Sequence, residues 1–170
     1  MSIVNIVATS HLSCIIDILL VSQQLKEAKY NISRIKALTY KFRDGGCCRI
    51  FSSGKLVVLG KKSLHSIATC LADLAQLIEG LGFPVVLQPF TIVNVVGICD
   101  LGVSINLTNF FNANVDFATY NPEIFPAVNL KWNGITYLVF ATGKITITGC
   151  SSIELMFHAC QVIKELTQKT

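Results

Sequence analysis

The chain has 170 residues, of which 52% are hydrophobic and 14% are charged. This composition excludes a disordered protein, and the length suffices for one sizeable core or two small fused ones. The net charge of +4 is uneven: residues 1–90 hold ten Lys and Arg against five acids, and residues 91–170 hold four Lys against five acids. A basic first half suits an anionic partner, but charge alone does not identify nucleic acid.

The expected elements form two copies of one α/β unit. In chain order, the first copy comprises a strand over 3–9, a helix over 13–26, strands over 34–43, 46–53 and 55–60, and a helix over 63–81. The second copy comprises strands over 90–98, 124–132, 135–141 and 144–149, and a helix over 151–167. Asp44-Gly45-Gly46 and Asn133-Gly134 lie between apolar runs, which predicts hairpin turns.

The two copies are related by an internal repeat. Asn5–Ala8 recurs as Asn94–Gly97, and Phe51–Gly60 recurs as Phe140–Gly149, both at an offset of 89 residues. Two copies are too few for a solenoid, so the repeat predicts a pseudo-twofold fused dimer joined near Pro84–Pro89. We expect a first repeat over 1–88 and a second over 89–170, fused into one domain.

At least eight strands with two long helices indicate an antiparallel sheet that has helices on one face. Because side chains alternate along a strand, the other face carries residues such as Val7, Val57 and Phe140 and is largely apolar. Such a face requires a partner outside the fold. An apolar, curved face with equivalent asparagines, Asn5 and Asn94, suits a DNA minor groove, whose A·T pairs offer only acceptors.

Blocks of sequence along the whole chain resemble the TATA-binding protein family. These blocks are Asn5–Thr9, Ser53–Val58, Leu81–Phe83, Asn94–Asp100, Tyr120–Pro126 and Thr142–Ile145. The resemblance implies an α+β fold of two tandem pseudo-twofold repeats, which form a curved ten-stranded antiparallel sheet, or saddle, with helices on its convex face. It also implies a transcription initiation factor that binds and bends A/T-rich promoter DNA.

The resemblance implies a role for each of several residues. The wedges that enter the DNA are Phe51, Ile35, Phe125 and Phe140; the groove-lining residues are Asn5, Val7, Arg49, Val57, Leu59, Asn94, Val96, Leu138, Thr146 and Thr148. The phosphate-binding residues are Lys41, Lys55, Lys62, Lys131 and Lys144, and the partner-binding residues are Tyr120, Pro122, Glu123 and Ile124. Taken without the resemblance, Phe125 and Phe140 would be interpreted as core.

Three positions of the first repeat depart from the family pattern. Ile35 stands where the family has a phenylalanine, Leu59 stands where it has a threonine, and Arg49 replaces an apolar side chain. Arg49 either enters a narrow minor groove or reaches a phosphate from the strand edge, and the second interpretation is favoured slightly. These departures support an alternative function, in which the saddle is mainly a protein-interaction platform with weak or no sequence-specific DNA binding.

The expected partners are double-stranded DNA and a transcription factor IIB-like protein. The family's first long helix is basic, but residues 63–81 contain no Lys or Arg, so a transcription factor IIA-like partner has diverged or is absent. The resemblance implies the nucleus, or the site of transcription in a virus-infected or parasite cell.

We expect no enzymatic activity, cofactor, metal or membrane segment. The seven cysteines form no CxxC pair and no zinc spacing, which predicts small apolar packing residues in a reducing compartment. The apolar run from Cys14 to Val21 is interrupted by Asp17 and is too short to cross a bilayer.

Overall fold

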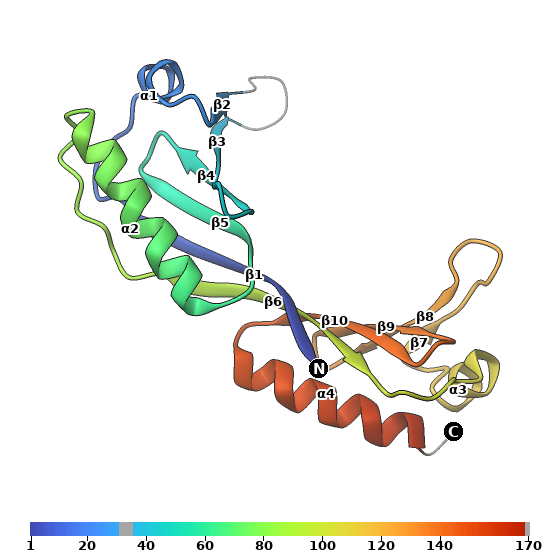
Figure 1. Ribbon diagram of the computed structural model, residues 1–170. Coiled ribbons are helices and arrows are strands. Elements are labelled where there is room, and N and C mark those ends of the chain that lie inside the picture. Colours follow the sequence, from blue (N-terminus) through green and yellow to red (C-terminus); the bar gives the residue numbers. More distant parts are fainter. Residues whose placement is uncertain (31–35, 169–170) are drawn as a thin grey trace. The chain divides into compact units, whose positions relative to one another are not determined.

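The computed structural model describes residues 1–30 and 36–168, and the chain divides into two compact units (Figure 1). We call Asn5–Val93 the first unit, and Asn94–Thr170 together with Met1–Val4 the second unit. Within the described residues, each unit is built from five strands and two helices. Neighbouring strands within each unit pair antiparallel.

The first unit has its strands in the spatial order β2-β3-β4-β5-β1. Its elements are β1 (Ser2–His11), α1 (Ile18–Gln24), β2 (Ala28–Tyr30), β3 (Ala37–Lys41), β4 (Cys47–Phe51), β5 (Lys55–Lys61) and α2 (Leu64–Gly80). The second unit has the corresponding order β7-β8-β9-β10-β6. Its elements are β6 (Thr91–Asp100), α3 (Leu107–Ala113), β7 (Ala118–Thr119), β8 (Ala127–Trp132), β9 (Ile135–Phe140), β10 (Lys144–Cys150) and α4 (Ile153–Gln168).

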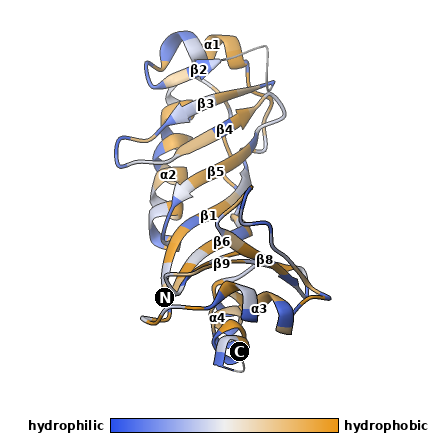
Figure 2. Cartoon of the chain, turned by 90° about the vertical axis from the view of Figure 1, so that its right-hand side faces the viewer, coloured by the Kyte–Doolittle hydropathy of each residue, from blue (hydrophilic) through white to orange (hydrophobic). Residues whose placement is uncertain are grey.

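Each sheet buries one face under its long helix, α2 on β5 in the first unit and α4 on β10 in the second. The buried sheet residues alternate along the strands and include Ile6, Ala8, Ile50, Leu56 and Val58 in the first unit, and Val95, Cys99, Val139, Ile145 and Ile147 in the second. Figure 2 shows hydrophobic residues along β3, β4 and β5. The alternation expected from the sequence is therefore present, and burial of apolar area against the helices stabilises each unit.

The helix predicted over 13–26 is shorter than expected, because it begins only at Ile18. The Asp17 carboxylate caps it by accepting hydrogen bonds from the backbone N–H groups of Leu19 and Leu20, at 3.0 and 3.1 Å. The residues before Asp17 are bound to another part of the chain, since the Ile16 N–H donates to the carbonyl of Ser52 at 2.8 Å. Its backbone groups therefore bind the turn after β4 instead of continuing a helix.

The predicted strand over 124–132 also begins late, at Ala127. The Asn121 carbonyl accepts hydrogen bonds from the N–H groups of Ile124 and Phe125, at 3.1 and 3.0 Å, so these residues form a turn and are unavailable to the sheet. The described part of β3 begins at Ala37, and the predicted start at residue 34 lies outside the described residues.

Three elements were not expected from periodicity, namely β2, β7 and α3. They contain three, two and seven residues, too few for a strand or helix period to be recognised. With β2 and β7, the described chain has the ten strands that the family resemblance implied.

The segment that joins the two repeats is bound to the sheet. The N–H of Val86 donates to the Leu12 carbonyl at 2.9 Å, and the N–H of Gln88 donates to the His11 carbonyl at 2.8 Å. All seven cysteines are free thiols, and five of them are buried, as packing residues should be. No helix in the described part of the chain is long and apolar enough to cross a membrane.

Candidate nucleic-acid interface

Each unit has a second sheet face, opposite its long helix, which we call the open face. Residues that alternate with the buried ones lie on it and are only half-buried: Asn5, Val7, Arg49, Phe51, Val57 and Leu59 in the first unit, and Asn94, Val96, Leu138, Phe140, Thr146 and Thr148 in the second. Every predicted groove-lining residue is therefore on an open face.

The strand registers align these residues into equivalent rows. In the first unit, Arg49 pairs with Val57 on one side and with Thr39 on the other. In the second unit, Leu138 pairs with Thr146 and with Asn129. Arg49 therefore occupies the place of Leu138, in the interior of its sheet, and is not at a strand edge as one interpretation assumed. Thr39 and Asn129 are open-face residues that the sequence analysis did not select.

The two repeated asparagines have one orientation in both units. The Asn5 Oδ1 accepts a hydrogen bond from the Gly60 N–H at 2.7 Å, and the Asn94 Oδ1 accepts one from the Gly149 N–H at 2.9 Å. Since a backbone N–H requires an acceptor, each amide must direct its NH₂ group away from the glycine. In the second unit that group donates to the Thr148 Oγ1 at 3.2 Å, whereas Leu59 offers Asn5 no such acceptor.

The glycines that hold these asparagines lie where the strand registers shift. Gly60 and Gly149 have φ values of +84° and +96°, a region that L side chains rarely adopt. A Cβ atom at Gly60 would lie 2.7 Å from the Gly46 Cα, and one at Gly149 would lie 2.8 Å from the Gly134 carbonyl oxygen. The bulges therefore need glycine, and they fix the asparagine oxygens.

The aromatic residues differ between the units. Phe125 and Phe140 form an edge-to-face pair with centroids 6.1 Å apart, and Phe125 is 44% exposed. In the first unit, Phe51 is half-buried beside Ala37, and its predicted companion Ile35 lies outside the described residues. Phe125 precedes β8 in the turn closed by the Asn121 carbonyl, and Asn121 also accepts from the Glu123 N–H through its Oδ1 at 3.2 Å. Asn121 therefore positions the turn, a role that its place within the Tyr120–Pro126 block did not predict.

The predicted partner-binding residues lie on the same turn. Pro122, Glu123 and Ile124 are exposed, and Ile124 has an exposed fraction of 80%. Tyr120 is half-buried and contacts Phe111 of α3, with centroids 6.2 Å apart. The turn therefore presents two large apolar side chains, Ile124 and Phe125, to solvent on a structured base.

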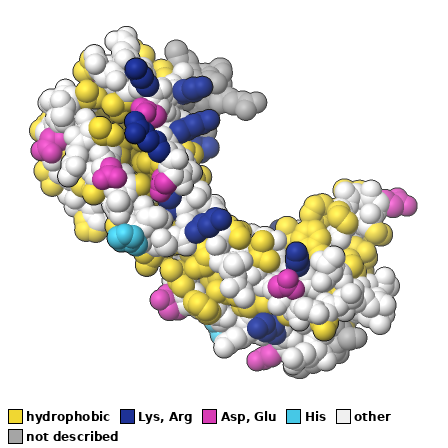
Figure 3. Space-filling model, viewed as in Figure 1, with side chains coloured by type: hydrophobic (Ala, Val, Ile, Leu, Met, Phe, Trp, Pro, Cys, Tyr) yellow, Lys and Arg dark blue, Asp and Glu magenta, His cyan; other side chains and the backbone are white. Residues whose placement is uncertain are grey.

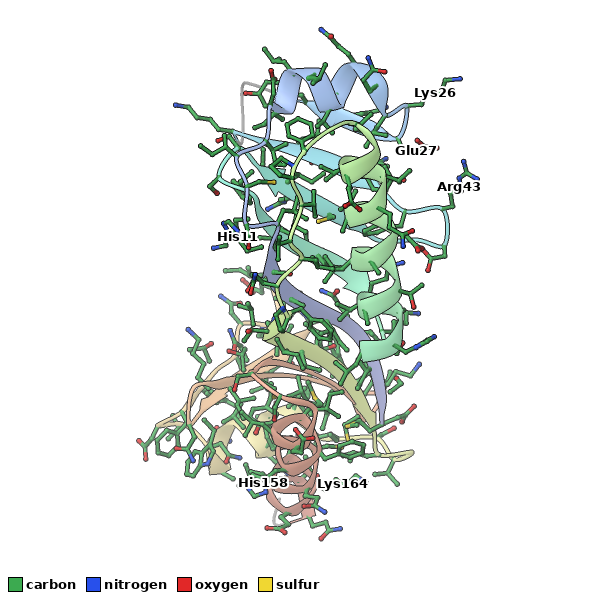
Figure 4. All side chains as sticks on the ribbon, turned by 90° about the vertical axis from the view of Figure 1, so that its left-hand side faces the viewer. His11, Lys26, Glu27, Arg43, His158 and Lys164 are labelled. Carbon is green, nitrogen blue, oxygen red and sulfur yellow. The ribbon has the colours of Figure 1, made fainter. Side chains whose placement is uncertain are left out.

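All five predicted phosphate-binding lysines are exposed: Lys41, Lys55, Lys62, Lys131 and Lys144. Lys61 behaves differently, because its side chain is only 3% exposed, pairs with Asp44 at 2.5 Å and has its Nζ 4.7 Å from the centre of the Phe42 ring. The hydrogen bond from Lys61 lowers the pKa of the Asp44 carboxyl. Arg43 pairs with Glu27 at 3.5 Å beside the same hairpin (Figure 4).

No cluster of three or more metal-binding side chains occurs in the described residues. Burial raises the pKa of the Cys99 thiol and of the Tyr137 hydroxyl to about 12 each, which keeps these two groups protonated at neutral pH. His158 and Lys164 project from α4, on the side of the sheet opposite the open face (Figure 4).

Comparisons with known proteins agree with this geometry. The family model described as "Transcription factor TFIID (or TATA-binding protein, TBP)" matches residues 1–81 and 89–170. TATA-box-binding protein 2 of Arabidopsis thaliana is 35% identical over 162 residues, which are 94% of this chain and 81% of that protein. The TATA-box-binding protein of Schizosaccharomyces pombe is 34% identical over 162 residues, which are 94% of this chain and 70% of that protein.

A solved structure extends the likeness to the fold. Methanococcus jannaschii TBP matches with a TM-score of 0.91 and 26% identity, over 99% of this chain and 98% of that one. The match confirms the predicted α+β fold class. Proteins of this family are DNA-binding transcription factors without enzymatic activity, which confirms that prediction as well. On its sequence, its repeat and its fold, the chain belongs to the TATA-binding protein family.

Proposed function

We propose that this protein is a transcription initiation factor that binds an A/T-rich, TATA-like promoter element through the minor groove and bends it. In this proposal the open faces contact the base edges, and Phe51, Ile35, Phe125 and Phe140 are the wedges. The protein acts without a cofactor, in the nucleus or at the site of transcription in a virus-infected or parasite cell.

The observation that carries this proposal is the fixed orientation of the two asparagines. Because Gly60 and Gly149 occupy the Oδ1 atoms of Asn5 and Asn94, each open face presents an amide donor between apolar side chains. In the minor groove, A·T and T·A pairs offer acceptors only, the adenine N3 and the thymine O2. A guanine N2 amino group would meet another donor and the apolar side chains of Val7 or Val96. This chemistry favours A/T pairs beneath the asparagines.

The wedge role is supported by the exposure of Phe125 and by its contact with Phe140. Inserting an aromatic ring between base pairs unstacks them and opens the groove, at a cost of roughly a few kcal/mol per step. The protein recovers this free energy when the wider groove contacts the apolar face. Phe125 has the exposure that insertion requires, and Phe140 lies in edge-to-face contact with it.

The exposed turn that carries Ile124 supports recruitment of a transcription factor IIB-like protein. Pro122 and Glu123 flank that side chain, and Asn121 fixes the turn. The exposed side of α2 carries Asp73 and Glu79 and no Lys or Arg, so a partner that binds a basic helix there has diverged or is absent.

A fluorescence assay of DNA bending tests the proposal. Duplexes that carry a donor dye and an acceptor dye at their ends, one with a TATA element and one rich in G·C, are titrated with protein at low salt. We expect energy transfer to increase for the TATA duplex and to stay near its starting value for the other. If neither duplex is bound, DNA binding is refuted and the interaction-platform alternative is favoured, as Arg49 and Leu59 would suggest.

A further inference from the structure

The second unit carries another open-face asparagine, Asn129, whose side-chain amide, unlike that of Asn94, makes no hydrogen bond to the described residues. Its Oδ1 is buried and accepts no hydrogen bond from the described residues. Asn129 lies on β8, where it pairs with Thr119 of β7 on one side and with Leu138 of β9 on the other. A buried acceptor without a donor lowers the stability of the folded chain, so its occurrence needs a physical explanation.

Asn129 lines a pocket of about 420 Å³ at the end of the second unit. The other lining residues include Thr119, Tyr120, Ile124, Phe125 and Leu138. The pocket therefore adjoins the exposed Phe125 ring, which is a wedge in the proposed function. A DNA base pair opened by this wedge would come to lie against Asn129.

We propose that Asn129 recognises guanine in the minor groove, by accepting a hydrogen bond from the N2 amino group of one G·C pair next to the Phe125 wedge. This inference rests on the proposed function and refines its sequence preference. The element bound would then be A/T-rich beneath Asn5 and Asn94, with one G·C pair accepted or preferred at the second-unit end.

Neither amide atom of Asn129 is hydrogen-bonded to the described residues, whereas both amide atoms of Asn94 are. At Asn94 the oxygen accepts from the Gly149 N–H and one amide hydrogen is donated to Thr148, which leaves one N–H for an acceptor of an A·T pair. At Asn129 the oxygen lacks a donor, and the guanine N2 amino group is the only base donor in the minor groove. A G·C pair supplies both this donor and further acceptors, so it can satisfy both ends of the Asn129 amide.

The amide is also free to turn toward DNA. No side-chain hydrogen bond joins Asn129 to the described residues, so rotation about its Cβ–Cγ bond breaks none. Asn94 differs, because rotation there would break the bonds to both Gly149 and Thr148.

Inosine provides the test, because it is guanine without the N2 amino group. One A·T pair at a time along a TATA element is replaced by G·C or by inosine·C, and binding is measured by fluorescence anisotropy. Scanning every position avoids any assumption about orientation. For the wild-type protein we expect one position at which the G·C duplex binds about fivefold or more tighter than the inosine duplex, from the 1–3 kcal/mol typical of a base contact.

Asn129→Leu removes the amide and keeps a similar volume. With this variant the preference at that position should disappear or reverse, while the all-A/T element is still bound. Thr39→Leu changes the equivalent position of the first unit and should leave the preference intact. Since the comparison of inosine with guanine uses the wild-type protein, it stands even if a variant folds poorly.

The outcomes separate this inference from the proposed function. If the inosine duplex binds more tightly than the G·C duplex at every position, or if Asn129→Leu keeps the G·C preference, the inference is refuted and minor-groove binding stands. If the all-A/T element itself is not bound, the proposed function fails.

Discussion

The two units share one backbone plan but have different open faces. Both hold an asparagine oxygen with a glycine N–H at a bulge, and both align three open-face residues across three corresponding strands. The side chains differ: Arg49, Leu59 and Thr39 in the first unit correspond to Leu138, Thr148 and Asn129 in the second. The two units therefore retain the same β-bulge and the same strand register, while the side chains on the open face differ from residue to residue.

The two halves of the chain also differ in their charge. Residues 1–90 have ten basic residues against five acidic ones, whereas residues 91–170 have four against five. Figure 3 shows Lys and Arg gathered mainly on the first unit in that view. The first unit thus carries most of the positive charge, and the second carries the Phe125–Phe140 pair and the Asn94–Thr148 contact.

The largest expected effect comes from the wedges. Phe125→Ala combined with Phe140→Ala should weaken binding to a TATA duplex by roughly 100-fold and abolish bending, since stacking contributes about 1–3 kcal/mol per aromatic ring. Phe51→Ala should cost only about tenfold on the same scale. Anisotropy and energy transfer measure the two effects.

The wedge comparison has a structural control. Phe157 is 55% exposed on α4, so Phe157→Ala removes an aromatic ring without touching either open face and should leave bending unchanged. Retained bending in the Phe125/Phe140 double variant would contradict the wedge role, and equal losses for Phe51 would contradict the asymmetry.

The second prediction concerns stability of the first unit. Lys61 is buried with Asp44 as its partner, whereas the equivalent position in the second unit is the uncharged Cys150. Asp44→Ala leaves a buried ammonium without its carboxylate and should lower the midpoint of urea unfolding at pH 7. Lys61→Met, which removes the charge and keeps the apolar stem, should be less destabilising than Asp44→Ala.

The pH dependence follows from the lowered pKa of Asp44. A carboxyl whose pKa is lower in the folded state stabilises the protein above the ordinary pKa and loses this contribution as the pH falls through the folded value. The difference between wild type and Asp44→Ala should therefore be present at neutral pH and shrink in acid. An identical pH dependence for both proteins would show that the ion pair contributes nothing.

The smallest expected effect tests the role of Arg49. If Arg49 binds a phosphate, Arg49→Leu, which copies Leu138, should make the slope of log K against log salt shallower by about 0.9. If Arg49 lies in the groove without a phosphate, binding will weaken while the slope is kept. The wild-type slope should itself be shallower than the value of about −9 expected for ten phosphate contacts, because five lysines are proposed for this role.

Much of the fold could be predicted from the sequence because the repeat and the strand alternation are local patterns. Asn5–Ala8 and Asn94–Gly97 mark equivalent strands. On their separate strands, Ile6, Ile50 and Leu56 are buried and each has less buried neighbours on both sides, as a period of two requires. The short elements were not predicted, because β7 has two residues and no period. The predicted start of the first helix, at residue 13, was wrong. The N–H of Ile16 bonds to the carbonyl of Ser52, which is distant in sequence, and α1 begins only at Ile18.

The candidate site divides in the same way. The sequence by itself determined which residues occupy the open faces, since a period of two assigns every strand residue to one side of a sheet. Only the tertiary structure decided which atoms of those residues are free. The oxygens of Asn5 and Asn94 are bound by glycines 55 residues away, and that of Asn129 has no donor in the described chain. Asn5 and Asn94 lie on strands that no hairpin joins to the strands of Gly60 and Gly149, so their register is fixed only when the sheet assembles.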